Sequence, residues 1–144
     1  MGALAGFASM VGDYAGRANF AVVYLEEAHP TDGWLYGAVE HFIPQHATLA
    51  ARQAAAQVLQ AELEAAWARL QLHPGGEPST FPCSVLVDGM GNAASLAFGA
   101  LPERLAVLVG GELRWLGGKG PENYSLLTAR DALDTLLASG GAPA

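Results

Sequence analysis

Three acid–base residues follow directly after a short apolar stretch near the start of the chain. In VVYLEEAHPTDGW, residues 22–34, a hydrophobic run gives way to Glu26, Glu27 and His29. Ligand sites in open α/β sheets lie beyond the carboxyl ends of the strands, and a histidine there can move a proton near neutral pH. Strand alternation would send the two glutamates to opposite faces. On spacing alone, a polar strand end that begins a loop is the simpler interpretation.

Two further histidines, His41 and His46, stand in the same predicted loop. With His29 and a glutamate they could ligate zinc or iron. Their spacing matches no compact ligand motif, and a solvated loop histidine is the ordinary alternative. We therefore predict no metal site.

Two other segments carry possible chemistry. Cys83, the single cysteine, opens the apolar stretch CSVLVD, where an inert role is usual and a redox role is the alternative. GGKGPENY, residues 117–124, resembles a phosphate-binding loop, but Leu113 stands where that loop needs glycine and Gly120 where it needs Ser or Thr. The segment is either a hairpin exit or the carrier of Lys119 as a flexible cation for an anionic ligand.

The composition is that of one folded domain. The chain has 144 residues, of which 51% are hydrophobic and 15% charged, and we predict a domain over 1–138 with a flexible tail over 139–144. The formal charge of −7 argues against a nucleic-acid or anionic-membrane partner. The apolar runs are too short for a membrane span.

The pattern predicts alternating helices and strands. The expected elements are a helix over 3–15, a strand over 19–27, a helix over 47–70, a strand over 83–88, a short helix near 92–99, a hairpin over 104–117 that turns at Gly110–Gly111, and a helix over 126–136. The long helix has a predicted apolar face of Leu49, Ala56, Leu63, Trp67 and Leu70. Strand, long helix and strand imply parallel pairing with a right-handed crossover.

These elements predict an α/β domain with a mixed sheet and helices on both faces, as in the later part of a thioredoxin-like fold. Such a fold opens with a strand before its first long helix, whereas this chain starts inside or just before that helix. Pro102 stands where a cis-proline would face the active site of such a fold.

Several of these segments together resemble the iodothyronine deiodinases, in order and at similar separations, from about Met1 to Leu137. The matching segments are VVYLEEAHPTDGW, IPQH, VLVDGMGN, AFGALPERL and LGGKGPENYS. The resemblance implies a thioredoxin-like oxidoreductase that removes iodine reductively from thyroid hormones. A selenocysteine attacks the iodine, and a thiol cosubstrate regenerates it without a bound cofactor. The segment over 60–82 is longer than in the vertebrate enzymes.

The resemblance also implies roles for single residues. His29 would hold the phenol of the substrate with Glu27 beside it, and Lys119 would face the amino-acid end. His46, Glu103 and Tyr24 would belong to a proton relay, because the aryl carbon that loses iodine must gain a proton. Cys83 would match a cysteine that assists reduction in some members. Leu101 departs from members with tyrosine at that position.

The nucleophile of the family is missing from this sequence. The family's selenocysteine motif would stand just before the first helix, and Met1 matches a methionine that follows it. We expect an in-frame UGA codon upstream of Met1, read as a stop. Without the strand that carries the nucleophile, strands 20–26 and 104–109 would face an unfilled slot, and we expect low solubility and no activity of the chain alone.

Two alternatives stay open at this point. The protein could be a thioredoxin-like redox protein or dehalogenase with another substrate, or a non-catalytic module that binds an aromatic acid between His29 and Lys119. Family members dimerise, and the family's membrane anchor lies upstream of the region that this sequence covers. The resemblance therefore also allows a homodimer and an anchored location.

Overall fold

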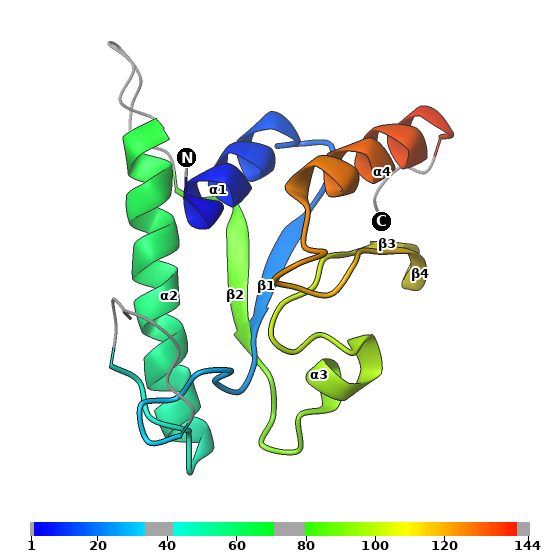
Figure 1. Cartoon of the computed structure of the whole chain (residues 1–144). Helices are drawn as coiled ribbons and strands as arrows, with labels where there is room; N and C mark the ends of the chain where they lie inside the picture. The colour runs from blue at the N-terminus through cyan, green and yellow to red at the C-terminus, as the bar shows by residue number, and fades with distance from the viewer. Residues whose placement is uncertain (1, 34–41, 71–79, 141–144) are drawn as a thin grey trace.

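The computed structural model describes residues 2–33, 42–70 and 80–140. Its elements are α1 (Ala3–Asp13), β1 (Phe20–Tyr24), α2 (Leu49–Leu70), β2 (Cys83–Val87), α3 (Ala93–Phe98), β3 (Ala106–Val109), β4 (Glu112–Leu116) and α4 (Leu126–Ala138), as Figure 1 shows. This is the predicted order, and the α/β class is confirmed. The predicted strand over 19–27 is too long, because β1 ends at Tyr24 and both glutamates lie beyond it.

The strands form two separate two-stranded sheets. β1 and β2 are parallel, with Phe20 opposite Cys83 and Tyr24 opposite Val87. β3 and β4 form the predicted antiparallel hairpin, and both turn glycines, Gly110 and Gly111, have positive φ. The prediction of one mixed sheet is not met in the described residues, because β1 and β3 are not hydrogen-bonded to each other.

The core lies where α1 packs against both α2 and α4. Its largest contributors are aromatic and branched side chains: Phe7, Val11, Tyr14, Leu63, Trp67, Phe81 and Leu133. Phe7 of α1 meets Phe20 of β1 edge to face, with ring centroids 6.3 Å apart. The first helix thereby joins the long helices to the parallel strands.

Helices cover β1 and β2 on one side. Phe20 and Val22 pack against the core, whereas Val23 and Leu86 are 39% and 53% exposed on the opposite face. The predicted cover on both faces is therefore absent from these two strands in the described part of the chain. The physical reason is that α1 and α2 pack against each other and so lie on the same side.

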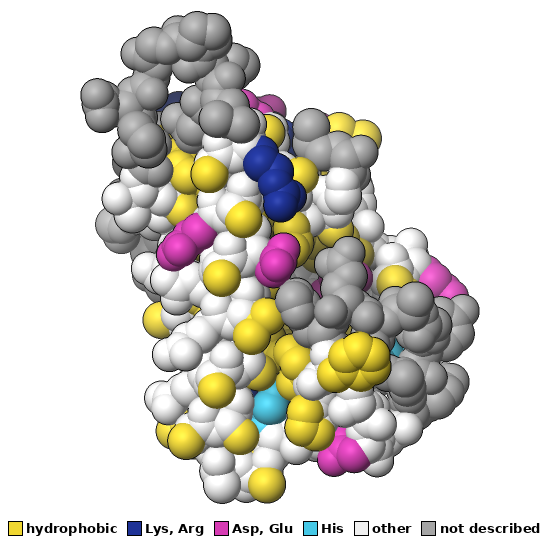
Figure 2. Space-filling view, turned by 90° about the vertical axis from the view of Figure 1, so that its left-hand side faces the viewer, with side chains coloured by type: hydrophobic (Ala, Val, Ile, Leu, Met, Phe, Trp, Pro, Cys, Tyr) yellow, Lys and Arg dark blue, Asp and Glu magenta, His cyan; other side chains and the backbone are white. Residues whose placement is uncertain are grey.

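Helix α2 keeps its predicted apolar face except at Leu49: Ala56, Leu63 and Trp67 are buried, and Leu70 packs against the core. Leu49 is 43% exposed, and Arg52 is buried in its place among Ala55, Ala56 and Leu63. The outer surface of the helix carries scattered small apolar side chains and few charges (Figure 2), so alanine's high helix propensity supports the helix more than polar contacts do. No helix among the described ranges is long and apolar enough to cross a membrane.

Candidate active site

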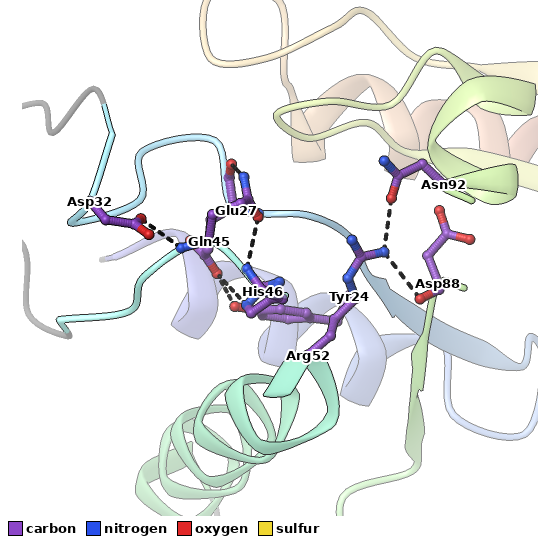
Figure 3. Close-up of polar contacts among 8 residues, drawn as sticks. All are labelled: Tyr24, Glu27, Asp32, Gln45, His46, Arg52, Asp88 and Asn92. Atoms are coloured by element: carbon purple, nitrogen blue, oxygen red, sulfur yellow. Dashed lines mark hydrogen bonds and ion pairs between the residues drawn. The ribbon is translucent and has the colours of Figure 1, made fainter. Parts of the chain in front are cut away.

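Two of the predicted relay residues, Tyr24 and His46, meet Glu27 beyond the carboxyl end of β1. The Tyr24 hydroxyl donates a hydrogen bond to Oε1 of Glu27, and Nε2 of His46 lies 3.8 Å from the same carboxylate oxygen. The rings of Tyr24 and His46 are 5.7 Å apart and tilted by 55°. Figure 3 shows the three side chains gathered beside the first turn of α2. A long loop separates His46 from β1 in the sequence, and the fold brings its side chain close to the end of this strand.

Burial sets the protonation of this cluster. His46 is 7% exposed, and burial lowers the pKa of its imidazole, opposed by Glu27 and reinforced by Arg52. Burial and the hydrogen bond to Glu27 raise the pKa of the Tyr24 hydroxyl. At neutral pH the cluster therefore holds a protonated phenol and a neutral imidazole beside Glu27. Such a row of groups can deliver a proton from solvent to a substrate.

Gln45 fixes Glu27 in place, and sequence reasoning missed it. The Glu27 N–H donates to Oε1 of Gln45 at 3.2 Å, and Nε2 of Gln45 donates to the Glu27 carbonyl at 3.0 Å. The Gln45 N–H in turn donates to Oδ1 of Asp32 at 2.8 Å. The Gln45 amide thus makes the two backbone hydrogen bonds with Glu27 that a neighbouring strand would otherwise make (Figure 3). Its position in IPQH, next to His46, was the available signal.

Arg52 is a second functional candidate that sequence reasoning missed. Its guanidinium is buried in α2, and Nη1 alone donates to the carbonyls of Asp88 and Gly89 and to Oδ1 of Asn92. All three acceptors belong to the turn between β2 and α3. Arg52 stands at helical spacing with the apolar residues Ala55, Ala56 and Leu63. This pattern could have indicated that its charge lies in the interior.

Asp88 organises the start of α3 in the same region. Its carboxylate accepts hydrogen bonds from the N–H groups of Ala94 and Ser95, at 3.0 and 2.9 Å. Burial would raise the pKa of Asp88, but these backbone hydrogen bonds and the nearby Arg52 outweigh burial and lower it. The carboxylate therefore stays ionised and satisfies two N–H groups of the first helical turn.

A cavity of about 540 Å³ joins the end of β1 to the segment before β3. Tyr24, Glu26 and Glu27 line one side, and Pro102, Glu103 and Tyr124 are among the residues on the other. The volume is within the range of small-molecule sites. The Leu101–Pro102 peptide bond is cis, as the thioredoxin-like expectation requires. The cavity thus brings Glu103 and the Tyr24–Glu27 pair to one space.

The loop after β4 is shaped around Glu103. The Gly120 N–H donates to the Glu103 carbonyl at 3.0 Å, and a Cβ on Gly120 would lie 2.3 Å from Cγ of Glu103. Burial, with the charge of Glu103 as a second cause, raises the pKa of Tyr124. Tyr124 is therefore another cavity residue that sequence reasoning did not single out.

A comparison with protein families shows to which family the chain belongs. The model of the family described as iodothyronine deiodinase matches residues 1–137. The chain belongs to the iodothyronine deiodinase family. The resemblance inferred from the five sequence segments is thereby confirmed.

Named relatives of this deiodinase-family chain include thyroxine 5-deiodinases. The human (Homo sapiens) protein is 36% identical over 134 residues, which cover 93% of this chain and 38% of the relative. The chicken (Gallus gallus) protein is 39% identical over 145 residues, covering 99% and 50%. The bullfrog (Aquarana catesbeiana) protein is 42% identical over 117 residues, covering 81% and 37%. The chain thus spans half or less of the length of these relatives.

The remaining predicted residues of this deiodinase-family site are His29, His41, Cys83 and Lys119. His29 and Lys119 are exposed, and His41 lies outside the described residues. Cys83 begins β2 opposite Phe20, so it lies four strand positions, about 13 Å, from the level of Tyr24. Burial raises the pKa of the Cys83 thiol to about 11. In the described ranges no three metal-binding side chains gather.

Proposed function

We propose that this protein catalyses reductive deiodination of thyroid hormone or a similar iodinated phenol. The observation that carries the proposal is the cavity with Tyr24 and Glu27 on one side and Glu103 and Pro102 on the other. Family membership supplies the reaction class. Overall, the aryl C–I bond becomes C–H, and two thiols are oxidised to one disulfide with release of iodide and a proton.

The proton relay of this reaction is assigned to Tyr24, Glu27 and His46. The aryl carbon gains a proton as iodine leaves, and the side chains of Tyr24 and Glu27, beside the buried imidazole of His46, are suited to supply it. Glu103, at the opposite side of the cavity, is a further carrier. His29 is proposed to hold the substrate phenol, and Lys119 the anionic group at its other end. Both are exposed and can reach a ligand that enters from solvent.

The nucleophile is proposed to be a selenocysteine on a segment outside this sequence. A selenolate supplies the electron pair that takes the iodine from carbon. Cys83 does not suit this role, because its thiol is protonated at neutral pH and lies at the far end of the parallel strands. A thiol reductant acts as the cosubstrate, and no bound cofactor is proposed.

Two cavities between the sheets support this assignment. They have volumes of about 540 and 370 Å³, and each is lined by Phe7, by Ala21 of β1, and by Leu105, Ala106 and Leu108 at β3. β1 and β3 thus face one another across apolar hollows without mutual hydrogen bonds. We propose that the nucleophile-bearing strand of a thioredoxin-like sheet fills this space and presents its selenocysteine next to Pro102.

The experiment begins with the DNA upstream of the Met1 codon. We expect an in-frame UGA within a selenocysteine motif. The restored protein, with cysteine or selenocysteine at that codon, should release iodide from thyroxine with dithiothreitol as reductant, and Tyr24→Phe and His46→Ala should each reduce kcat by about 10²-fold or more. Iodinated tyrosines, tested side by side, report the substrate class. An upstream region without the codon and a protein without iodide release would refute the proposal.

A further inference from the structure

Glu26, the partner of Glu27 in the sequence, has a different set of contacts. Oε2 of Glu26 accepts a hydrogen bond from Nδ2 of Asn92 at 3.0 Å. Asn92 precedes α3 and has a left-handed backbone, with φ of 54°. The two adjacent carboxylates therefore serve different neighbours, because Glu27 meets Tyr24 and His46 while Glu26 meets the β2–α3 turn.

Asn92 is in turn held by Arg52. Its Oδ1 accepts from Nη1 of Arg52 at 2.8 Å (Figure 3). The same nitrogen donates to the Gly89 carbonyl at 2.8 Å. Arg52 is 2% exposed, so its charge is buried and its hydrogen bonds stabilise more than exposed ones would. One amide side chain thus connects a buried guanidinium on α2 with a carboxylate beyond β1.

We propose that Arg52 and Asn92 are positioning residues that act through Glu26 to hold the exit of β1, and with it Glu27, in the geometry that meets His46. This inference deepens the proposed function, because it assigns a support to the proton relay. Arg52 lies on α2 and Asn92 lies in the β2–α3 turn, so the support comes from two elements that carry no relay residue. Gln45 holds the opposite side of Glu27.

The test uses hydrogen exchange measured by mass spectrometry on the 144-residue chain, which needs neither turnover nor high concentration. Asn92→Gly tolerates the left-handed backbone and removes only the amide. It should speed exchange of the Glu27 N–H about tenfold, the effect of losing one hydrogen bond to a charged group. Glu26→Ala should do the same, Glu26→Gln should retain the native rate because it keeps an acceptor, and the Asn92→Gly/Glu26→Ala double variant should add nothing.

A second readout follows the imidazole itself. The groups that face His46 are Glu27 and Tyr24 from β1 and its exit, and Arg52 from α2. Glu27 opposes the effect of burial on His46, so misplacing it should move the pH midpoint of His46 C2-hydrogen exchange to lower pH in Asn92→Gly, as in Glu27→Gln. Arg130→Met, which breaks the ion pair between α4 and Asp13, is the control for general destabilisation and should leave the midpoint unchanged.

Three results would contradict the positioning role. Native exchange at Glu27 in Asn92→Gly, equal acceleration along all of β1 and β2, or a His46 midpoint that stays in place or rises would overturn the inference. Because these readouts are independent of catalysis, they can support the positioning role even where iodide release is not found. Arg52→Lys and Arg52→Met extend the series, and Asn92→Gly keeps it decisive where an Arg52 variant does not fold.

Discussion

Gln45 satisfies both backbone polar groups of Glu27 with a single side chain. A neighbouring strand would pair with the N–H and the carbonyl in the same way. Here the amide of Gln45, from the loop before α2, takes that place. Because the same residue precedes His46, one short segment provides both the support of the carboxylate and the imidazole that meets it. This relationship ties the residues that follow β1 to the segment before α2.

Replacing Gln45 should therefore have a measurable cost. Gln45→Ala removes two hydrogen bonds at Glu27 and should lower the free energy of unfolding by about 1–2 kcal/mol, as measured by urea denaturation. Gln60→Ala is a matched control, because the Gln60 amide donates to the exposed Glu64 side chain on the same helix. An equal effect of the two variants would contradict the proposed support of Glu27.

The buried His46 predicts a loss of stability in mild acid. Its folded pKa lies below the ordinary value of 6.5, with burial as the main cause, so the unfolded chain binds a proton that the folded chain does not. The contribution of neutral His46 is fully present above pH 6.5 and is lost as the pH falls below that value toward the folded pKa. Urea midpoints between pH 5 and 7.5 should decline less in His46→Gln than in the native chain. An equal decline of the midpoints in the two proteins would contradict this prediction.

Asp88 predicts a second, more acidic transition. Its folded pKa is lower than 3.8 because backbone hydrogen bonds outweigh burial, so its contribution is present above that value and is lost as the pH falls through the folded pKa. Asp88→Asn should cost about 1–3 kcal/mol at pH 7, and this difference should shrink below about pH 4. Asp131→Asn, on the exposed side of α4, should show no comparable cost. A difference that does not change with pH would count against the ionised cap.

The contact between Gly120 and Glu103 predicts an effect of one methyl group. A Cβ on Gly120 would lie 2.6 Å from Oε1 of Glu103, so Gly120→Ala must displace that carboxylate and should cost about 1–3 kcal/mol. Gly89→Ala is the control, because its added Cβ meets nothing within 4 Å. A crystal structure of the Gly120 variant with Glu103 in its native place would refute the prediction.

The order of elements could be predicted because each leaves a local pattern. Val and Tyr over 20–24 favour a strand, and Gly110–Gly111 requires the positive φ angles that the structure has. The end of β1 could not be predicted, since Leu25 and both glutamates continue the strand pattern. After Tyr24 the backbone leaves the sheet. The Glu27 N–H then donates to the side chain of Gln45, eighteen residues away.

Sequence reasoning named three side chains that the structure brings together, and it missed the residues that support them. Tyr24, Glu27 and His46 were named from the family resemblance, and the structure brings them together. Arg52 was overlooked because the spacing of Leu49, Ala56 and Leu63 suggested an apolar helix face. The charge is tolerated in the interior only because the β2–α3 turn presents three oxygen acceptors, and that encounter is a property of the tertiary fold.

The parallel register of β1 and β2 has a practical consequence for chemical labelling. It leaves the chain's one thiol, Cys83, at the far end of the strands with a pKa raised to about 11. Alkylating reagents attack the ionised form of a thiol, so at neutral pH iodoacetamide will react slowly with Cys83 and far faster with an ionised selenolate. Brief alkylation can therefore count active nucleophiles in the restored enzyme against a silent internal background.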